Sequence, residues 1–279
     1  MTPAVNFPLV AVDVGNSRVK FGLFADPDVD SCSSRSLPQP VKTLVVDPRI
    51  DSWDLLDAWV AGAKLGDFTW WIASVQRQVS AQLVERLRAA GVERITLVSS
   101  GDLPLEIEVP RPDMVGIDRL LGAVGANRLR DPARPAIVVH LGTAITANLV
   151  TADGVFRGGA IMPGIGMSAR AFHQFTDLLP LIDMQSLAEP PPAVGDSTVP
   201  AMTSGLYWGA VGGVKQLIEL FGREAAKYGD QATAAPPQTI LTGGAAQSVA
   251  QLLPGEAQLV PDLVLSAIAI AATKSAKPR

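Results

Sequence analysis

The chain has 279 residues, and its hydrophobic fraction of 48% with a mean hydropathy of +0.26 predicts a well-buried globular protein. Its net charge of −4 argues against a nucleic-acid-binding surface, which needs clustered cations. No apolar run reaches the roughly 18–20 residues of a membrane span, and the N-terminus lacks a signal-peptide pattern. We therefore expect a cytoplasmic protein that binds neither nucleic acid nor membrane.

The first half of the chain begins with a predicted β-hairpin, in which residues 9–14 and 18–24 alternate around a Gly-Asn-Ser turn. The segment 26–50, which is interrupted by Asp, Pro and Ser residues, is expected to contain one further strand near Thr43–Val46. Helical and β-strand patterns then alternate. We expect helices at 53–63, 79–90 and 117–129, and strands at 70–75 and 94–98.

The second half repeats this organisation after a break at Pro132 and Pro135. We place the domain boundary in that break, which gives domains of residues 1–131 and 132–279. Strands are predicted at 136–141, 145–150 and 155–161, and another at 239–242 before a glycine turn. Helices are predicted at about 166–179 and 203–228, with helical stretches from the glycine turn to the end.

One short pattern occurs twice, about half the chain apart: LVAVDVGNS at 9–17 and IVVHLGTAIT at 137–146. Each copy is a β-branched run, then a polar residue, then a turn that contains glycine. Backbone N–H groups exposed at such a turn can hold a phosphate. Two such turns facing each other across a cleft would hold a nucleoside triphosphate from both sides.

The polar residue of the first copy is Asp13, at the end of a predicted buried strand. A carboxylate in this place can hold a magnesium ion or its waters while the turn amides face phosphate oxygens. The alternative is an ordinary hairpin in which Asp13 hydrogen-bonds the turn. The second copy of the pattern favours the phosphate interpretation.

A second candidate is the run Gly116-Ile117-Asp118-Arg119, which precedes a predicted helix. Asp118 could accept a proton from an attacking hydroxyl while Arg119 holds an anionic substrate group. The alternatives are a helix cap for Asp118 and a surface ion pair for Arg119.

His140 stands in the second copy where the first has Asp13. A buried histidine beside a glycine turn is more often a structural hydrogen-bonding group than a ligand. Late in the chain, Thr242-Gly243-Gly244 would let a flat ligand such as adenine approach the backbone, but a helix-entry turn is equally compatible.

Together these residues resemble the type III pantothenate kinases, a branch of the acetate and sugar kinase, Hsp70 and actin superfamily. The first turn resembles the family's Asp-x-Gly-Asn-Thr motif, and Gly116–Arg119 resembles its Gly-Ala-Asp-Arg motif. Four further stretches follow in family order: Leu141–Thr146, the Gly-Gly-x-Ile-x-Pro-Gly stretch 158–164, Gly195–Gly205 and Thr242–Gly244.

The resemblance implies a duplicated ribonuclease-H-like (actin-like ATPase) α/β fold, with two similar domains around a nucleotide cleft. It implies phosphorylation of pantothenate by ATP to 4'-phosphopantothenate, the first step of coenzyme A synthesis, with Asp118 as general base. It also implies a homodimer in which the Thr198 region reaches the partner's pantothenate. Magnesium would come with the ATP, near Asp13, and a monovalent cation, K⁺ or NH₄⁺, is expected.

By the same resemblance, ATP would be contacted by seven residues: Asp13, Gly15, Asn16, Ser17, Lys20, Gly142 and Thr143. Pantothenate would be held by Gly116, Ile117, Arg119 and Thr198.

Two of the departures from the family pattern concern the second phosphate motif, and a third is Val109 or its neighbours, which replace a tyrosine shortly before the substrate motif. His140 stands where the family has the aspartate associated with the monovalent cation, and Asn148 replaces an acidic residue shortly after that motif. Hard cations prefer oxygen ligands, and charge stabilisation dominates phosphoryl transfer. The departures at the second phosphate motif motivate an alternative function, a catalytically weak or silent nucleotide-binding paralogue with a regulatory role.

Overall fold

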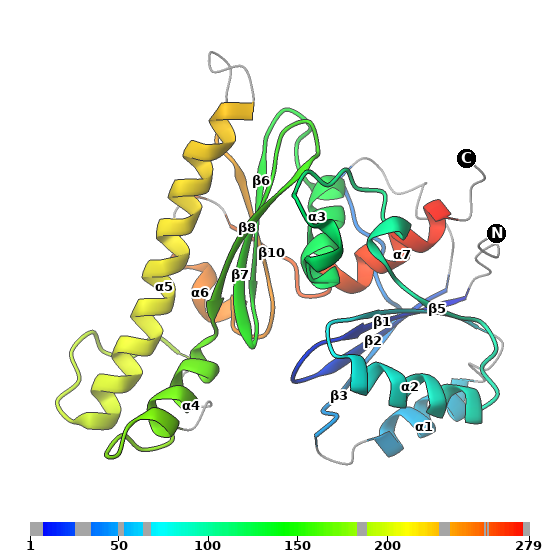
Figure 1. Cartoon of the computed structure of the whole chain (residues 1–279), viewed down its shortest axis with the longest axis horizontal. Helices are drawn as coiled ribbons and strands as arrows, with labels where there is room; N and C mark the ends of the chain where they lie inside the picture. Colours follow the sequence, from blue (N-terminus) through cyan, green and yellow to red (C-terminus); the bar gives the residue numbers. More distant parts are fainter. Residues whose placement is uncertain are drawn as a thin grey trace. The chain divides into compact units, whose positions relative to one another are not determined.

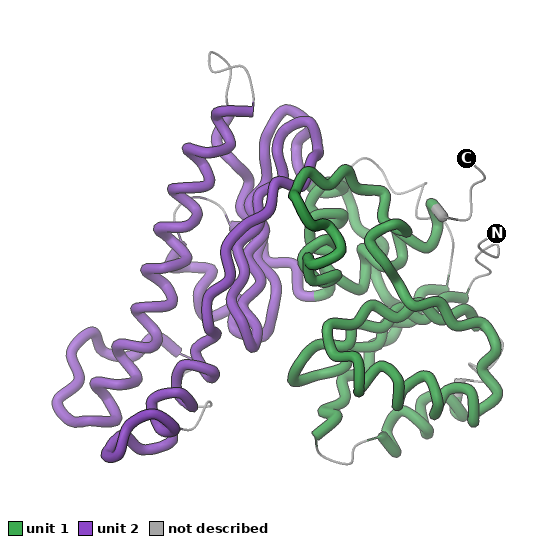
Figure 2. Tube along the Cα trace, in the orientation of Figure 1, with its two compact units in different colours: residues 1–129, 262–279 green, residues 130–261 purple. Residues whose placement is uncertain are grey.

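The structure is a computed structural model of the chain, which describes residues 8–25, 35–49, 53–63, 68–182, 189–228, 235–253, 255 and 257–275. The chain forms two compact units (Figure 2). Unit 1 comprises residues 1–129 and 262–279, and unit 2 comprises residues 130–261. This differs from the division expected at residues 131 and 132, because the C-terminal helix packs with the first unit.

Unit 1 is built on a five-stranded sheet in the order β3-β2-β1-β4-β5. The central strand β1 pairs antiparallel with β2, as the hairpin pattern predicts, and parallel with β4. The strands are β1 (Leu9–Val14), β2 (Val19–Phe24), β3 (Lys42–Val46), β4 (Thr69–Ser74) and β5 (Ile95–Leu97).

Helices cover both faces of this sheet (Figure 1). Alternate residues of β1, from Val10 to Val14, face a core formed with α1 and α2. Within it the rings of Phe21, Trp59 and Trp70 pack with centroids 6.1–6.4 Å apart. α3 and α7 contact the sheet from the other side. The helices are α1 (Trp53–Ala63), α2 (Arg77–Ala89), α3 (Ile117–Leu129) and α7 (Leu263–Ser275), with short 3₁₀ turns at Ser100–Asp102 and Pro112–Met114.

The last helix, α7, belongs to unit 1 because its apolar side chains are buried there against α3 and the sheet. Its stretch from Ala267 to Ala272 is at most 5% exposed. The two helices approach closely at Gly125, where an added Cβ would overlap the Leu263 side chain. Small residues at a helix crossing permit this short interaxial distance. The sequence of α7 is apolar on every side of the helix because the helix is buried on every side from Leu263 to Ala272.

Unit 2 repeats the arrangement of unit 1, with sheet order β10-β9-β6-β7-β8. Its central strand β6 pairs antiparallel with β7 and parallel with β9, as β1 does with β2 and β4. This shared topology confirms the predicted duplicated α/β fold. The strands are β6 (Ala136–Leu141), β7 (Ala144–Val150), β8 (Phe156–Pro163), β9 (Gln238–Thr242) and β10 (Gln258–Leu259).

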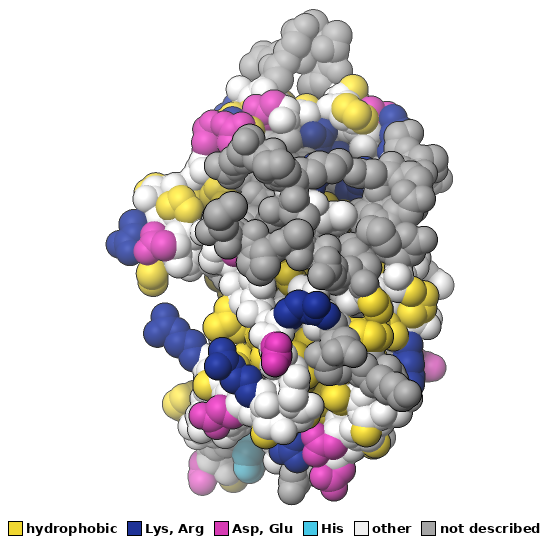
Figure 3. Space-filling view, turned by 90° about the vertical axis from the view of Figure 1, so that its right-hand side faces the viewer, with side chains coloured by type: hydrophobic (Ala, Val, Ile, Leu, Met, Phe, Trp, Pro, Cys, Tyr) yellow, Lys and Arg dark blue, Asp and Glu magenta, His cyan; other side chains and the backbone are white. Residues whose placement is uncertain are grey.

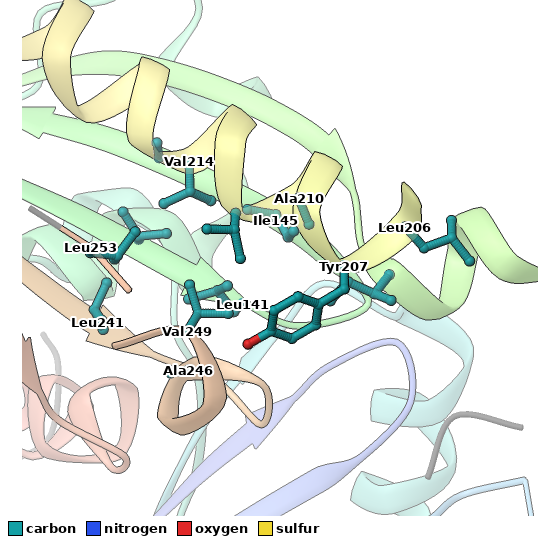
Figure 4. Close-up of a cluster of buried hydrophobic side chains, with 14 of the residues drawn as sticks. Leu141, Ile145, Leu206, Tyr207, Ala210, Val214, Leu241, Ala246, Val249 and Leu253 are labelled. Atoms are coloured by element: carbon teal, nitrogen blue, oxygen red, sulfur yellow. The ribbon is translucent and has the colours of Figure 1, made fainter. Parts of the chain in front are cut away.

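The core of unit 2 lies between its sheet and α5 and α6 (Figure 4). Leu141 and Ile145, which flank the second turn, point into this core, and the Tyr207 hydroxyl donates to the Ser248 carbonyl at 2.7 Å. Because strand residues alternate between faces, His140, which directly precedes Leu141 on β6, lies on the opposite face. The helices are α4 (Ile165–Phe175), α5 (Thr198–Ala225) and α6 (Ala246–Ala250), with a 3₁₀ turn at Ala226–Tyr228.

Several element boundaries differ from the sequence-based expectation. α5 begins at Thr198 rather than at 203, because Pro200 lies in the first turn, where its missing N–H costs no helical hydrogen bond. α4 ends at Phe175, since Thr176 is extended. The two-residue strand β10 was expected to be helical, and its two-residue length leaves no periodicity to detect.

None of the helices in the described ranges combines the length and apolar character that a membrane crossing needs. On the face drawn in Figure 3, acidic and basic side chains are interspersed, in keeping with the net charge of −4.

Candidate functional site

The first turn, between β1 and β2, is closed by glycine. The Gly15 N–H donates to the Arg18 carbonyl at 3.0 Å, and an added Cβ on Gly15 would lie 3.2 Å from that oxygen. The predicted turn residues Asn16 and Ser17 follow, exposed and half-buried respectively. The hairpin that the sequence predicts is thus present, with a compact polar turn at its tip.

Asp13 lies one residue before the end of β1, on the face of the sheet that α3 and α7 cover. The period-two alternation places it with Leu9 and Ala11 rather than with the core valines. Lys20 is its direct cross-strand partner on β2, so the two side chains share that face. Two of the residues predicted to contact ATP are therefore neighbours.

Asp118 lies in the first turn of α3 and points back over the helix start. Its Oδ1 accepts the Arg119 N–H at 2.9 Å, an N–H that also donates to the Gly116 carbonyl at 3.0 Å. An added Cβ on Gly116 would lie 2.6 Å from this oxygen and 3.8 Å from Val75 Cγ1. Glycine at 116 thus leaves room for the carboxylate beside Val75, which follows β4.

The fold brings Asp118 close to Asp13. The N–H of Val75 donates to the Val14 carbonyl at 3.0 Å, so the ends of β1 and β4 meet beside the start of α3. In the sequence, Asp13 and Asp118 belong to two separate motifs. Their proximity depends on a long-range packing contact, which no local pattern could reveal.

The electrostatics of this group are unfavourable for a charged Asp13. Burial, together with the negative charge of Asp118, raises the pKa of Asp13 to about 7, against the opposing effect of Lys20. Burial also lowers the pKa of Arg119, against the favourable field of Asp118. Unit 1 thus holds two carboxylates and two basic side chains in one partly desolvated cluster.

This cluster fits a magnesium ion. A divalent cation would favour the ionised form of Asp13, which burial and Asp118 disfavour, and carboxylate oxygen is a preferred magnesium ligand. Within the described ranges, no three His, Cys, Asp or Glu side chains gather into a metal-binding group. Magnesium commonly binds through one or two carboxylates and completes its shell with water and phosphate oxygens, so the donor set is adequate.

The second turn, between β6 and β7, is also closed by glycines. The Gly142 N–H donates to the Ala144 carbonyl at 3.1 Å, and the Gly164 N–H donates to the Thr143 carbonyl at 3.0 Å. An added Cβ on Gly164 would overlap the backbone of the turn. The Gly-Gly-x-Ile-x-Pro-Gly stretch therefore ends against the second turn, with Gly142 exposed and Thr143 half-buried.

His140 takes the same place in unit 2 that Asp13 takes in unit 1. Each is the penultimate residue of its central strand, and His140 lies in register with Thr146 on β7 and Thr242 on β9. Asn148, two residues along β7 on the same face, is buried and donates its Nδ2 to Thr146 Oγ1 at 3.2 Å. Amide, hydroxyl and imidazole groups thus line this end of the second sheet.

The late glycine turn Thr242–Gly244 serves as a helix entry. It leads into α6, and Gly243 has a φ of +101°, a left-handed conformation that favours glycine. An added Cβ there would lie 2.7 Å from His140 Cδ2. The turn therefore also makes room for the imidazole ring.

Thr198 is the first residue of α5 and is exposed. The preceding segment is fixed to the helix by two side chains that the sequence analysis did not single out as donors. Ser204 Oγ donates to the Ala193 carbonyl at 2.7 Å, and Trp208 Nε1 donates to the Pro191 carbonyl at 3.1 Å. Thr198 lies in unit 2 and the Gly116–Arg119 run in unit 1.

Comparison with known proteins agrees with these motifs. The sequence model of the type III pantothenate kinase family matches residues 9–220. A type III pantothenate kinase of Rhodopirellula baltica is 34% identical over 277 residues, which cover 93% of this chain and 96% of the relative. The chain belongs to the type III pantothenate kinase family.

Two further comparisons agree with these findings, one with the family and one with the fold alone. The type III pantothenate kinase of Rhodospirillum rubrum is 30% identical over 268 residues, covering 94% of this chain and 96% of that protein. A solved structure of a candidate 2-dehydro-3-deoxygalactonokinase from Sinorhizobium meliloti aligns over 97% of this chain and all of its own length, with 16% identity and a TM-score of 0.52. That structural likeness concerns the fold alone.

Proposed function

We propose that this protein transfers the γ-phosphoryl group of ATP to pantothenate, giving 4'-phosphopantothenate in the first step of coenzyme A synthesis. The observation that carries the proposal is the proximity of Asp13 and Asp118 in unit 1, with Lys20 and Arg119 beside them. Two motifs that stand far apart in the family's sequence pattern thereby contribute to one cluster. The choice of pantothenate as the substrate rests on membership of the type III pantothenate kinase family.

Asp118 is proposed as the general base. Its carboxylate is half-buried at the start of α3, where it would accept the proton of the pantothenate hydroxyl as that oxygen attacks the γ-phosphorus. Arg119, together with Gly116 and Ile117, is proposed to hold pantothenate, whose carboxylate suits a guanidinium.

The first turn with Asp13 and Lys20, and the second turn with Gly142 and Thr143, are proposed to bind ATP. The Lys20 ammonium and the amide and hydroxyl side chains of the two turns are donors of the kind that phosphate oxygens accept. Magnesium, held by Asp13, would neutralise charge that develops on the phosphates. Asp13 would then bind in its ionised form, which the metal favours.

A homodimer is also proposed, with Thr198 contributing to the partner's pantothenate site as the family resemblance implies. Support comes from a set of exposed apolar side chains that we call the α4 apolar surface. It spans α4, the segment after it and the start of α5, which α4 contacts. Its members are Met167, Phe172, Phe175, Leu178, Leu181 and Val199.

The test of the proposed chemistry is Asp118→Asn, assayed by ADP release with ATP, magnesium and pantothenate. Loss of the base is expected to lower kcat by about 10²–10⁴-fold, because this is the usual contribution of general-base catalysis. Binding of both substrates, measured by calorimetry, should remain largely intact, since asparagine keeps the shape of the side chain.

Asp113→Asn is the matched control. Asp113 lies five positions earlier in an exposed ion pair with Arg111, so its loss should leave the rate unchanged. Turnover by Asp118→Asn at the wild-type rate would remove Asp118 as the base. ADP release that does not depend on pantothenate would contradict the proposed substrate.

A second candidate function is a nucleotide-binding regulatory protein without efficient transfer. The observation that favours it is the polar but uncharged lining of the second turn, where Asn148 and Thr146 are hydrogen-bonded to each other. ATP binding in calorimetry without pantothenate-dependent turnover by the wild-type protein would support this function over the kinase.

A further inference from the structure

The two units of the duplicated fold have different side chains at one equivalent position of the central strand. The penultimate residue of the central strand is Asp13 in unit 1 and His140 in unit 2. Asp13 has a lysine as its cross-strand partner, whereas His140 has Thr146. The first turn therefore has a carboxylate that suits a hard cation, and the second turn has a nitrogen heterocycle.

The His140 ring lies between two glycine turns. Its Nε2 would be 3.3 Å, and its Cδ2 3.5 Å, from a Cβ added to Gly142. On the other side, a Cβ on Gly243 would lie 2.7 Å from Cδ2. The Nε2–Cδ2 edge of the imidazole therefore faces the second turn, and glycine at both positions leaves the space that the ring occupies.

The side chains in register with His140 offer no carboxylate to the monovalent cation that the family resemblance implies. Potassium takes oxygen ligands and is favoured by a nearby carboxylate. The residues in register with His140 are Thr146 and Thr242, and the next polar group on β7 is the Asn148 amide, which donates to Thr146. Imidazole, hydroxyl and amide groups supply no negative charge.

We infer that His140 serves the second turn in place of a monovalent cation, by presenting an imidazole N–H to a phosphate oxygen of the bound nucleotide. This inference rests on the proposed ATP binding. Its geometric basis is that the Nε2–Cδ2 edge of the ring lies beside Gly142, within the second turn at the end of β6. Nucleotide affinity should consequently be independent of potassium, and the second turn should hold no monovalent ion.

The experiment measures Mg-ATP binding by calorimetry in KCl and in choline chloride at equal ionic strength, for the wild type and for His140→Asp. The wild-type Kd should agree between the two salts within about twofold, which is a difference of roughly 0.4 kcal/mol. His140→Asp places a carboxylate beside the phosphates, so its Kd should rise by about tenfold in choline chloride and recover in KCl.

Thallium-205 NMR, with Tl⁺ as a potassium mimic, gives a second measurement that needs no nucleotide. Saturable Tl⁺ binding is expected for His140→Asp and not for the wild type. His173→Asp is the matched control, because His173 is the other histidine of the chain and is exposed on α4. This control should behave as the wild type in both measurements.

The possible outcomes separate the inference from the proposed function. A wild-type Kd at least about fivefold lower in KCl, or saturable Tl⁺ binding by the wild type, would overturn the role of His140 while leaving ATP binding in place. Absence of Mg-ATP binding in either salt would overturn the proposed function itself, and the inference with it. If His140→Asp fails to fold, the two wild-type comparisons still decide the question.

Discussion

At the scale of single residues, Asp13 makes the stability of the protein depend on pH. Its pKa is about 7 in the folded protein and 3.8 in the unfolded chain. Between these values the folded state retains a proton that the unfolded state has released. Raising the pH from about 4 to 7 therefore lowers the free energy of unfolding, and the loss is complete above pH 7.

Asp13→Asn should relieve this penalty. The variant should be more stable than the wild type at pH 8, by up to about 4 kcal/mol at 1.36 kcal/mol per pKa unit, and the difference should be smallest near pH 4. Thermal unfolding of both proteins without magnesium at several pH values measures it.

Asp57→Asn provides a control of opposite sign. A hydrogen bond from Arg86 lowers the pKa of Asp57, so that pair stabilises the fold at neutral pH and its contribution falls as the pH is lowered through the acid range. A difference between Asp13→Asn and the wild type that did not change with pH would show that Asp13 is not buried as described.

The candidate residues of this site could be proposed from the sequence, but their environment could not. Asp13, Asp118 and His140 were proposed because each stands two positions from a glycine in a motif. The raised pKa of Asp13 was not predictable, because it arises from burial by α3 and α7 and from a carboxylate more than a hundred positions away. The position of the His140 ring between two glycine turns likewise depends on pairing of distant strands.

At the scale of elements, the crossing of α3 and α7 is the contact most sensitive to volume in unit 1. Gly125→Ala adds a methyl group that would overlap the Leu263 side chain. We expect this overpacking to lower the free energy of unfolding by about 1–3 kcal/mol. Chemical denaturation of the variant and the wild type measures the effect.

Gly212→Ala is the matched control, because a Cβ at this exposed position of α5 would meet no atom within 4 Å. It should raise stability by about 0.5–1 kcal/mol through better helix propensity. A stable Gly125→Ala variant would mean that the two helices can separate without cost.

Most elements of both hairpins and of the helices in unit 1 were predictable, since strand alternation and helical periodicity are local signals. The two failures have different causes. The start of α5 was missed because Pro200 looks like a helix breaker, although in the first turn it is harmless. The strand β10 forms only because β9 offers it a parallel partner, which its own two residues do not reveal.

At the scale of the whole molecule, the α4 apolar surface predicts self-association. Phe175 and Leu178 are 79% and 86% exposed, and contiguous exposed apolar side chains mark interaction surfaces. Replacing both by aspartate should shift the protein from dimer to monomer and raise the KM for pantothenate, with folding retained. Light scattering after size exclusion measures the mass, and the ADP-release assay measures the KM.

Leu220→Asp on the later part of α5 is the control, since it introduces an aspartate at an exposed apolar residue outside the α4 apolar surface. A wild-type protein that is monomeric at assay concentration would exclude the homodimer. Dissociation by both substitutions alike would place the interface elsewhere on unit 2.

The duplication itself was predictable from the repeated turn pattern, and the equivalent strand orders of the two sheets confirm it. The division of the chain into two units was harder to predict from the sequence. Proline residues near 132 mark the passage into unit 2 correctly to within a few positions, but nothing in the apolar sequence of α7 indicates which sheet it covers.

The return of α7 to unit 1 also sets the order in which the protein can be completed on the ribosome. Unit 2 is one continuous segment of the chain. Unit 1, in contrast, lacks the buried helix α7 until the residues after 262 have been synthesised. Domains usually fold in the order in which they emerge. In this protein the unit whose synthesis begins first is completed last. One apolar face of its sheet therefore stays incompletely covered until all of unit 2 has been synthesised.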